Sequence, residues 1–263
     1  MTLMNILTIF FIIIYSVCSV SIFFFSLIQL DLFLNYKKSK TKEKNIILKN
    51  FKNLPFVTVQ LPIYNEQNVI KRLLDAVVKI DYPSDKIEIQ VLDDSDDYST
   101  VYVKNLISKL KRKTNLKINH IIRKKREGYK AGALKYGLKL AKGNYIAIFD
   151  ADFIPKSDWL KKTICGFKDP KIGAVQTKWN HINKDFSLLT KIQAFALDIH
   201  FTLEQVGRSF NSCFLNFNGT AGIWRKEAIL TSGNWKDDTL TEDLDLSYRA
   251  QLKGWRIRYM ESI

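Results

Sequence analysis

The first thirty residues constrain this chain more than any other stretch, because Met1 to Leu30 carries no charged residue. The stretch is rich in Ile, Phe, Leu and Val. About 20 apolar residues in a helix cross a bilayer, so it is long enough to span one with some tilt. A secretory signal fits poorly, because the start carries no positive charge, the apolar run is too long and no small-x-small cleavage site follows. We predict a transmembrane helix over residues 1–34.

A basic linker, predicted over residues 35–54, follows the apolar stretch. Its basic residues are Lys37, Lys38, Lys40, Lys42, Lys44, Lys49 and Lys52, against one acid, Glu43. Positive charge beside a spanning helix indicates the cytoplasmic side, and lysines here can also bind anionic headgroups. We therefore predict a single span in this chain, with the N-terminus outside and the body of the protein at the cytoplasmic membrane face.

The net charge of +15 raises the question of nucleic acid. A second basic cluster, Lys109 to Arg126, has no interleaved aromatic residues, no helix-turn-helix and no zinc-ligand spacing, so it predicts no specific nucleic-acid partner. A surface that faces solvent, a membrane or a diphosphate is the preferred interpretation. The three cysteines are isolated, which implies neither disulfides nor a metal cluster, and His181 and His200 are interpreted as structural.

Strands and helices alternate through the rest of the chain. Strands are predicted at 56–61, 87–92, 118–122, 145–149, 172–178, 214–217 and 256–260, and helices at 69–78, 100–110, from the glycine-containing loop at 126–134, at 188–206 and at 244–252. Asn65 is placed to cap the helix at 69–78. This order predicts an α/β domain over residues 55–263, with a doubly wound, mostly parallel sheet flanked by helices.

Two predicted strands end in acids. Asp150 and Asp152 follow the buried strand at 145–149, and four aspartates follow the strand at 87–92. Ligands of open α/β sheets lie at the carboxyl ends of the strands, where an Asp-x-Asp pair offers hard oxygen ligands to Mg²⁺ or Mn²⁺. Taken alone, such a pair is equally typical of a turn or a helix cap. A basic, glycine-containing turn between the two strands suits a nucleotide diphosphate, whereas the P-loop and dinucleotide fingerprints are absent.

Seven short motifs then lie in a fixed order between Phe56 and Met260. They are Leu61-Pro62-Ile63-Tyr64-Asn65-Glu66, Leu92-Asp93-Asp94-Ser95, Gly128-Tyr129-Lys130-Ala131-Gly132-Ala133-Leu134, Asp150-Ala151-Asp152, Val175-Gln176-Thr177-Lys178-Trp179, Phe217-Asn218-Gly219-Thr220-Ala221-Gly222 and Thr241-Glu242-Asp243. Together they resemble the membrane-bound glycosyltransferases of family 2, which have a GT-A type of nucleotide-binding fold. The resemblance is strongest to the cellulose-synthase-like branch that includes glucomannan synthases.

The resemblance implies roles for individual residues. It assigns Asp93 to the nucleotide base, near Pro62 and Tyr64, and Lys130 to the diphosphate. It assigns Asp150 and Asp152 to the ribose and the metal, with Asp152 the more certain ligand, and Asp243 to the catalytic base. Further substrate-binding residues implied in this way are Glu66, Asp94, Gly219, Thr220 and Glu242. Without the resemblance, Thr241 to Asp243 is also a good helix start, since threonine caps helices and acids favour the first turn.

The implied activity is an inverting transfer of a hexose from a nucleotide sugar. A divalent ion and Lys130 would neutralise the leaving diphosphate, and Asp243 would accept the proton of the acceptor hydroxyl. UDP-glucose is the first donor candidate and GDP-mannose the second, with a β-linked polysaccharide as acceptor. The alternatives are glycosylation of a membrane lipid, or a nucleotide-sugar-binding module without turnover.

The C-terminal end departs from the family pattern. Family members carry a Gln-x-x-Arg-Trp motif and further membrane spans beyond Thr-Glu-Asp, whereas only 20 residues follow Asp243 here. We interpret the GT-A domain as lacking its C-terminal part. The expectation is that donor binding is retained, whereas acceptor transfer needs the missing elements.

Overall fold

The computed structural model describes residues 3–42 and 53–263, which form two compact units. The first unit joins the N-terminal segment, up to Ile46, with residues Asn183–Cys213. The second unit contains Ile47–Ile182 and Phe214–Ile263. The predicted linker lies only partly within the described residues, since 43–52 fall outside them, and its first part continues the N-terminal helix.

The first unit is built on the long helix α1, Leu3–Lys42. Its most apolar 18-residue window has no residue buried inside the protein, and the helix is long and apolar enough to cross a membrane. This confirms the predicted long apolar N-terminal helix. The helix α7, Gln205–Phe210, packs against α1 so closely that a Cβ atom added at Gly207 would lie 2.7 Å from the Leu32 carbonyl oxygen.

The predicted helix at 188–206 is present but not uniform. It begins as α6, Leu188–Ile199, with a capping box in which the Ser187 hydroxyl accepts from the Thr190 amide at 3.1 Å. A π-helical segment, η3 (His200–Glu204), interrupts it before α7 continues to Phe210. His200 Nδ1 lies 2.8 Å from Glu204 Oε2 within that segment, in keeping with its structural interpretation.

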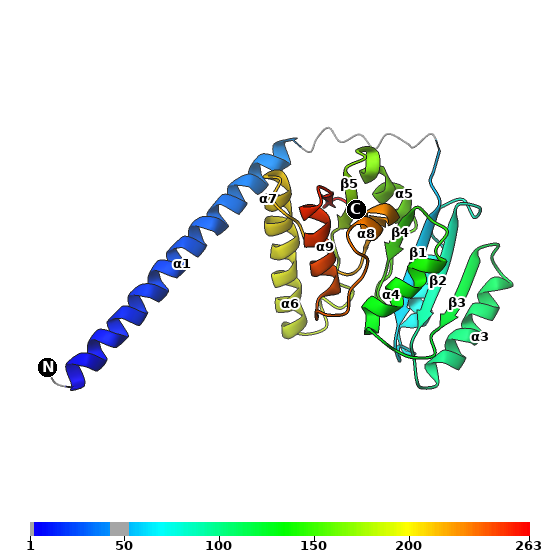
Figure 1. Cartoon of the computed structure of the whole chain (residues 1–263), viewed down its shortest axis with the longest axis horizontal. Coiled ribbons are helices and arrows are strands. Elements are labelled where there is room, and N and C mark those ends of the chain that lie inside the picture. The colour runs from blue at the N-terminus through cyan, green and yellow to red at the C-terminus, as the bar shows by residue number, and fades with distance from the viewer. Residues whose placement is uncertain (1–2, 43–52) are drawn as a thin grey trace. The chain divides into compact units, whose positions relative to one another are not determined.

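The second unit contains a seven-stranded sheet in the order β3-β2-β1-β4-β6-β5-β7 (Figure 1). The strands are β1 (Val57–Ile63), β2 (Ile87–Asp93), β3 (Lys117–Ile122), β4 (Tyr145–Ile148), β5 (Ile172–Thr177), β6 (Gly222–Arg225) and β7 (Arg256–Met260). All neighbours pair in parallel except β6, which runs antiparallel to both β4 and β5. The sheet is therefore mostly parallel, as predicted, and β6 was missed.

Helices connect the strands of this sheet. They are α2 (Ile70–Val77), α3 (Ser99–Lys111), α4 (Tyr129–Leu140), α5 (Trp159–Ile164), the 3₁₀ turn η2 (Cys165–Lys168), α8 (Lys226–Thr231) and α9 (Glu242–Leu252). The sequence pattern predicted α2, α3, α4 and α9, whereas α5, η2 and α8 were missed. The short helices were missed because six residues do not develop a helical period.

Strand β1 is buried on both faces, although its sequence alternates between apolar and polar residues. Polar side chains meet across the sheet on one face: the Thr58 hydroxyl donates to Glu88 Oε1 at 2.8 Å, and the side-chain amides of Gln60 and Gln90 lie 3.0 Å apart. Buried polar groups must be paired in this way, because an unpaired one loses its hydrogen bonds to water. Gly143, in the loop before β4, packs against the same part of β1, and its amide donates to the Thr58 hydroxyl at 2.9 Å.

Two local predictions were wrong. Residues 214–217 form no strand, because side chains of α9 take up their backbone groups: the Leu215 amide donates to Gln251 Oε1 and the Phe217 amide to Ser247 Oγ, both at 2.9 Å. Asn65 does not cap α2. It adopts a left-handed φ of 57°, and its side-chain amide donates to Asp96 Oδ1 at 2.8 Å, which joins the loops after β1 and β2.

Replacing Gly143 with alanine tests the close packing beside β1. The added Cβ would lie 2.4 Å from the Thr58 backbone nitrogen, so the loop must move away from the strand. We expect the free energy of unfolding to fall by about 1–3 kcal/mol, the usual range for overpacking. Urea unfolding of the detergent-solubilised chain measures it, with Asn144→Ala at the exposed neighbouring position as the matched control. Equal stability of the two variants would contradict the prediction.

Candidate functional site

A cavity of 390 Å³ opens at the carboxyl ends of the central strands. Parallel pairing aligns the ends of β1 and β2, where Ile63 lies opposite Asp93, and brings β4 alongside β1. Seven of the predicted site residues line the cavity: Pro62, Tyr64, Glu66, Asp94, Lys130, Asp150 and Asp152. Ile63, Val69, Arg126, Ala133 and Ala151 complete its lining.

Lys130 makes the contacts that join this edge of the sheet to the start of α9. It lies in the first turn of α4, after Gly128, whose φ of 69° favours glycine. Its Nζ lies 2.6 Å from Asp150 Oδ1 and 3.8 Å from Glu242 Oε1, and donates to the Gly219 carbonyl oxygen at 3.2 Å. One ammonium group thus contacts the segment after β4, the turn before β6 and the first residue of α9.

The two carboxylates that contact Lys130, those of Asp150 and Glu242, have raised pKa values. Burial raises the pKa of Asp150, an effect that Lys130 opposes and that the charges of Asp152 and Asp243 reinforce. Burial likewise raises the pKa of Glu242, again against the effect of Lys130. Negative charge is therefore concentrated beyond what one lysine neutralises, and an added cation would stabilise the ionised forms.

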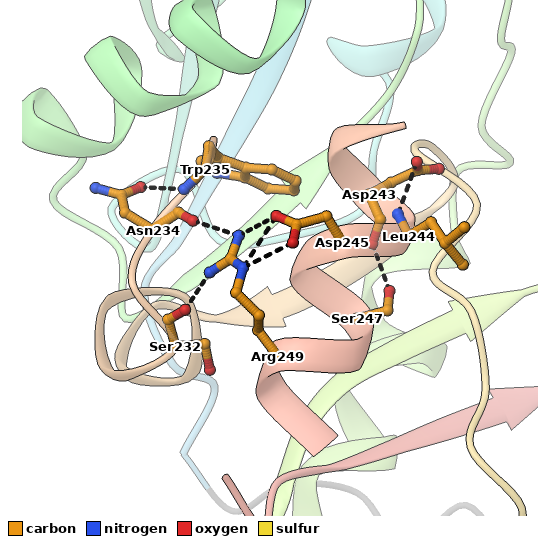
Figure 2. A network of polar contacts seen from close by, with 8 residues as sticks. All are labelled: Ser232, Asn234, Trp235, Asp243, Leu244, Asp245, Ser247 and Arg249. Atoms are coloured by element: carbon orange, nitrogen blue, oxygen red, sulfur yellow. Dashed lines mark hydrogen bonds and ion pairs between the residues drawn. The ribbon is translucent and has the colours of Figure 1, made fainter. Parts of the chain in front are cut away.

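The Asp243 carboxylate lies beside the turn at Gly219, which Lys130 also contacts. A Cβ atom added at Gly219 would lie 3.1 Å from Asp243 Oδ2 and 3.3 Å from Lys130 Nζ, and the φ there is 74°. The other carboxylate oxygen, Oδ1, accepts from the Leu244 amide at 2.8 Å, as Figure 2 shows. The Thr241 side chain makes no capping bond, although the first turn of α9 contains Glu242, Asp243 and Asp245.

Helix α9 is held in place by Arg249, a residue that the sequence analysis did not single out. Its guanidinium pairs with Asp245, at 3.0 and 2.9 Å from Nε to the two carboxylate oxygens, and donates to the carbonyl oxygens of Ser232 and Asn234 (Figure 2). Two of its partners lie in the loop after α8. The spacing of an acid and an arginine four residues apart on one helix was the available signal.

Asp93 and Asp94 have different surroundings. Asp93 is fully buried and does not line the cavity; its carboxylate lies 2.7 Å from His120 Nε2 and accepts from the Ser95 amide at 2.9 Å. Burial acts to raise the pKa of Asp93, but the hydrogen bonds from His120 and Ser95 outweigh it and lower the pKa overall. Asp94 forms a two-pronged ion pair with Arg123, which also donates to the Glu127 carbonyl oxygen.

The outer wall of the cavity contains a stacked pair. The Arg126 guanidinium carbon lies 3.3 Å from the centre of the Tyr64 ring, and the Tyr64 hydroxyl donates to Asp96 Oδ2 at 3.0 Å. That hydrogen bond raises the pKa of Tyr64. Arg126 belongs to the cluster that we interpreted as a surface facing solvent, a membrane or a diphosphate, and it lines the cavity.

The donor set suits a hard divalent ion completed by a substrate. Within residues 3–42 and 53–263 no group of three or more His, Cys, Asp or Glu side chains is placed to hold a metal alone. Mg²⁺ and Mn²⁺ are commonly bound by one or two carboxylates together with substrate phosphates. Asp150 and Asp152 on the cavity wall meet that requirement, and Asp152 is exposed.

Residues 58–229 match the family model described as glycosyl transferase family 2, so the chain belongs to that family. It is 47% identical over 213 residues to the probable glucomannan 4-beta-mannosyltransferase 4 of Oryza sativa subsp. japonica, covering 80% of this chain and 39% of the relative. It is 44% identical over 212 residues to glucomannan 4-beta-mannosyltransferase 2 of Arabidopsis thaliana, covering 79% of this chain and 40% of that protein. The matched part of the chain thus spans well under half of the length of these relatives.

Solved structures show the same fold. The mannosyltransferase PcManGT from Pyrobaculum calidifontis, solved in complex with GDP-Man and Mn²⁺, aligns with a TM-score of 0.66 and 26% identity, over 88% of this chain and 62% of that one. S. aureus TarS in complex with UDP aligns with a TM-score of 0.57 and 18% identity, over 78% and 57% of the two chains, and shows the fold alone. The predicted family and GT-A type fold are therefore confirmed.

The buried pair of Asp93 and His120 predicts a pH-dependent stability. Because the pKa of Asp93 is lowered in the folded state, the stabilisation is complete above the ordinary aspartate pKa of about 3.9 and is lost as the pH falls through the folded value. Asp93→Asn should therefore lose stability relative to the natural chain at pH 7, by an amount that shrinks below about pH 4. Urea unfolding across this range measures the difference.

The matched control is Asp85→Asn, an exposed aspartate in the turn before β2. Its difference from the natural chain should stay near zero throughout. A stability loss of Asp93→Asn that is independent of pH would show that packing, and not the ionised carboxylate, is responsible.

Proposed function

We propose that this chain binds the donor of an inverting, metal-dependent hexosyltransferase that extends a β-linked polysaccharide at the cytoplasmic membrane face. The observation that carries the proposal is the position of Lys130 Nζ, in contact with Asp150 and Gly219 beside a cavity at the strand ends. This arrangement offers a cation for a diphosphate and carboxylates for a metal in one place. Membership of glycosyl transferase family 2 supports the same reading.

GDP-mannose is the preferred donor in this proposal, ahead of UDP-glucose. The similar plant proteins are named as glucomannan 4-beta-mannosyltransferases, and the similar archaeal mannosyltransferase was solved with GDP-Man. The plant names also favour a polysaccharide acceptor over a membrane lipid. An α-linked donor sugar transferred with inversion gives a β-glycoside, which agrees with the β-linkage in those names.

The residues around Lys130 have separate tasks in the proposed reaction. Asp150 and Asp152 would hold a divalent ion, which supplies positive charge against the diphosphate when bound. Lys130 would exchange part of its contact with Asp150 for diphosphate oxygens and stabilise the negative charge that develops on the leaving group. Gly219 leaves room for Asp243 Oδ2, which would accept the proton of the acceptor hydroxyl.

The remaining predicted residues form the surroundings of the donor. Tyr64 and Glu66 line the cavity on the side of β1 and would face the nucleoside. Both carboxylate oxygens of Asp93 are engaged, by His120 and by the Ser95 amide, so Asp93 would position the end of β2 beside the nucleotide base. Thr220 accepts from the Asp150 amide at 3.0 Å and so would keep the metal-side loop in place.

The membrane location completes the proposal. Helix α1 is a candidate span, and Lys37 and Lys38 follow its uncharged part. Positive charge at this end supports an orientation with the second unit on the cytoplasmic side. Cytoplasmic nucleotide sugars would then reach the cavity directly.

We predict that the purified chain binds GDP-mannose more tightly than UDP-glucose, and that Lys130→Met weakens this binding roughly ten-fold or more, because a charged hydrogen bond to the diphosphate is lost. Isothermal titration calorimetry in detergent with Mn²⁺ present measures both affinities. Asp243→Asn is the matched control, since it alters the same cluster but should keep donor binding. Unchanged affinity in Lys130→Met would refute the assignment of Lys130.

A second prediction concerns the metal. Asp152→Asn should remove the gain in GDP-mannose affinity that Mn²⁺ gives to the natural chain, because an amide is a much poorer ligand for a hard cation than a carboxylate. Titrations with Mn²⁺ and with EDTA measure the gain, and Asp85→Asn should retain it. If Asp152→Asn still responds to Mn²⁺ like the natural chain, the metal is held elsewhere.

A further inference from the structure

Arg123 joins three segments beside the cavity, although it is not one of the residues that line it. It directly follows β3, and the pairing of Ile122 with Asp93 places it next to Asp94 at the end of β2. Its guanidinium pairs with both carboxylate oxygens of Asp94, with Nε donating to Oδ1 at 2.7 Å. The side chain of Arg123 is only 10% exposed, so water does little to weaken this ion pair.

The remaining hydrogen bonds of Arg123 hold the backbone at the start of α4. Its Nη1 donates to the Glu127 carbonyl oxygen at 2.8 Å, and its Nη2 donates to the Tyr129 carbonyl oxygen at 3.1 Å. These two carbonyl groups flank Gly128, and Lys130 follows directly. A planar guanidinium can serve a carboxylate and two carbonyl groups at once, because its N–H donors have a fixed fork geometry that an ammonium group lacks.

The backbone that Arg123 holds has an unusual conformation. Gly128 has a φ of 69° and Tyr129 has a φ of 46°, and residues other than glycine adopt such values at a cost in free energy. Because Tyr129 is 67% exposed, the packing of its ring contributes little to holding this conformation. The hydrogen bonds from Arg123 therefore stabilise the turn that sets the direction of the first residues of α4.

Gly132 shows how closely the guanidinium fits against α4. A Cβ atom added at Gly132 would lie 2.0 Å from the Glu127 carbonyl oxygen and 2.7 Å from Arg123 Nη1. The hydrogen bond between those two groups thus occupies the space that a side chain would fill. The first turn of α4 cannot shift without disturbing the guanidinium, and the reverse also holds.

The side chain of Lys130 extends from this turn. Lys130 is the second residue of α4, and its Nζ lies 2.6 Å from Asp150 Oδ1 and 3.2 Å from the Gly219 carbonyl oxygen. Because a hydrogen bond is lost beyond about 3.5 Å, a displacement of the turn by about 1 Å is enough to separate these groups. The place of the ammonium in the cavity therefore depends on what fixes the turn.

We propose that Arg123 is a positioning residue for the donor, which fixes the first turn of α4 so that Lys130 meets the diphosphate. The charge of Arg123 is neutralised by Asp94, and Arg123 does not line the cavity, so it acts through Lys130 and not on the donor itself. The inference rests on the proposed function, because it takes the diphosphate as the ligand of Lys130.

A double-mutant cycle tests whether Arg123 acts through Lys130. Isothermal titration calorimetry in detergent with Mn²⁺ measures the GDP-mannose affinity of the natural chain, Arg123→Gln, Lys130→Met and the double variant. The matched control is Lys124→Gln, which removes an exposed cation at the neighbouring position and should bind like the natural chain. Two residues that act as a unit give non-additive effects, whereas the effects of independent residues add.

The expected result is that Arg123→Gln weakens donor binding about five- to ten-fold. The double variant should bind as Lys130→Met does, within about two-fold, because a turn without its lysine has nothing left to position. Arg123→Lys gives a second test if Arg123→Gln fails to fold. It keeps a cation beside Asp94 but loses the fork that reaches both carbonyl groups, so it should show a similar loss that also vanishes together with Lys130→Met.

Two results would overturn the inference alone. If Arg123→Gln or Arg123→Lys binds GDP-mannose like the natural chain while Lys130→Met does not, the turn needs no support from the guanidinium. If the losses of the single variants multiply in the double variant, Arg123 acts independently of Lys130. Natural affinity in Lys130→Met is a different outcome, which would overturn the proposed function and the inference with it.

Discussion

The ion pair between Lys130 and Asp150 is the interaction on which the candidate site depends. Asp150, Glu242 and Asp243 come from two segments more than ninety positions apart in the sequence, and their charges repel one another at partly buried positions. Burial raises the pKa of Asp150 and of Glu242, and the ammonium of Lys130 opposes that effect at both carboxylates. A site that is to accept a cation and then a diphosphate needs ionised carboxylates and a lysine that can be shared, and this geometry supplies both.

The surrounding structure keeps this cluster in position by backbone contacts. Gly219 has no side chain and a positive φ, which lets the turn before β6 approach both Lys130 and Asp243. Thr220 receives the Asp150 amide, and Arg249 fixes α9 against the loop after α8. Each contact joins segments that are distant in sequence, so the site forms only when the sheet and α9 have packed together.

The sequence predicted the parts of this arrangement that are written in local patterns. Buried strands with acids at their ends, and the motifs around Lys130 and Asp150, were sufficient for six of the seven strands and most of the cavity lining. Residues 214–217 were misread as a strand, since an apolar run does not reveal that Ser247 and Gln251 will bond its backbone. The partners of Asp93 and Asp94, His120 and Arg123, could not be predicted because only the register of β2 and β3 brings them there.

The apolar residues of α6 are mostly exposed, which the sequence pattern did not reveal. Periodicity identifies an apolar face but not what covers it, and lipid and protein interior give the same pattern. The location of this helix bears on the candidate site because the chain runs on from it to the turn at Gly219. The segment Cys213 to Phe217 leads directly from the α7 side of the first unit to the turn at Gly219, and hydrogen bonds from Leu215 and Phe217 join it to α9. Helices α6 and α7 are therefore covalently continuous with the turn beside which Asp243 lies.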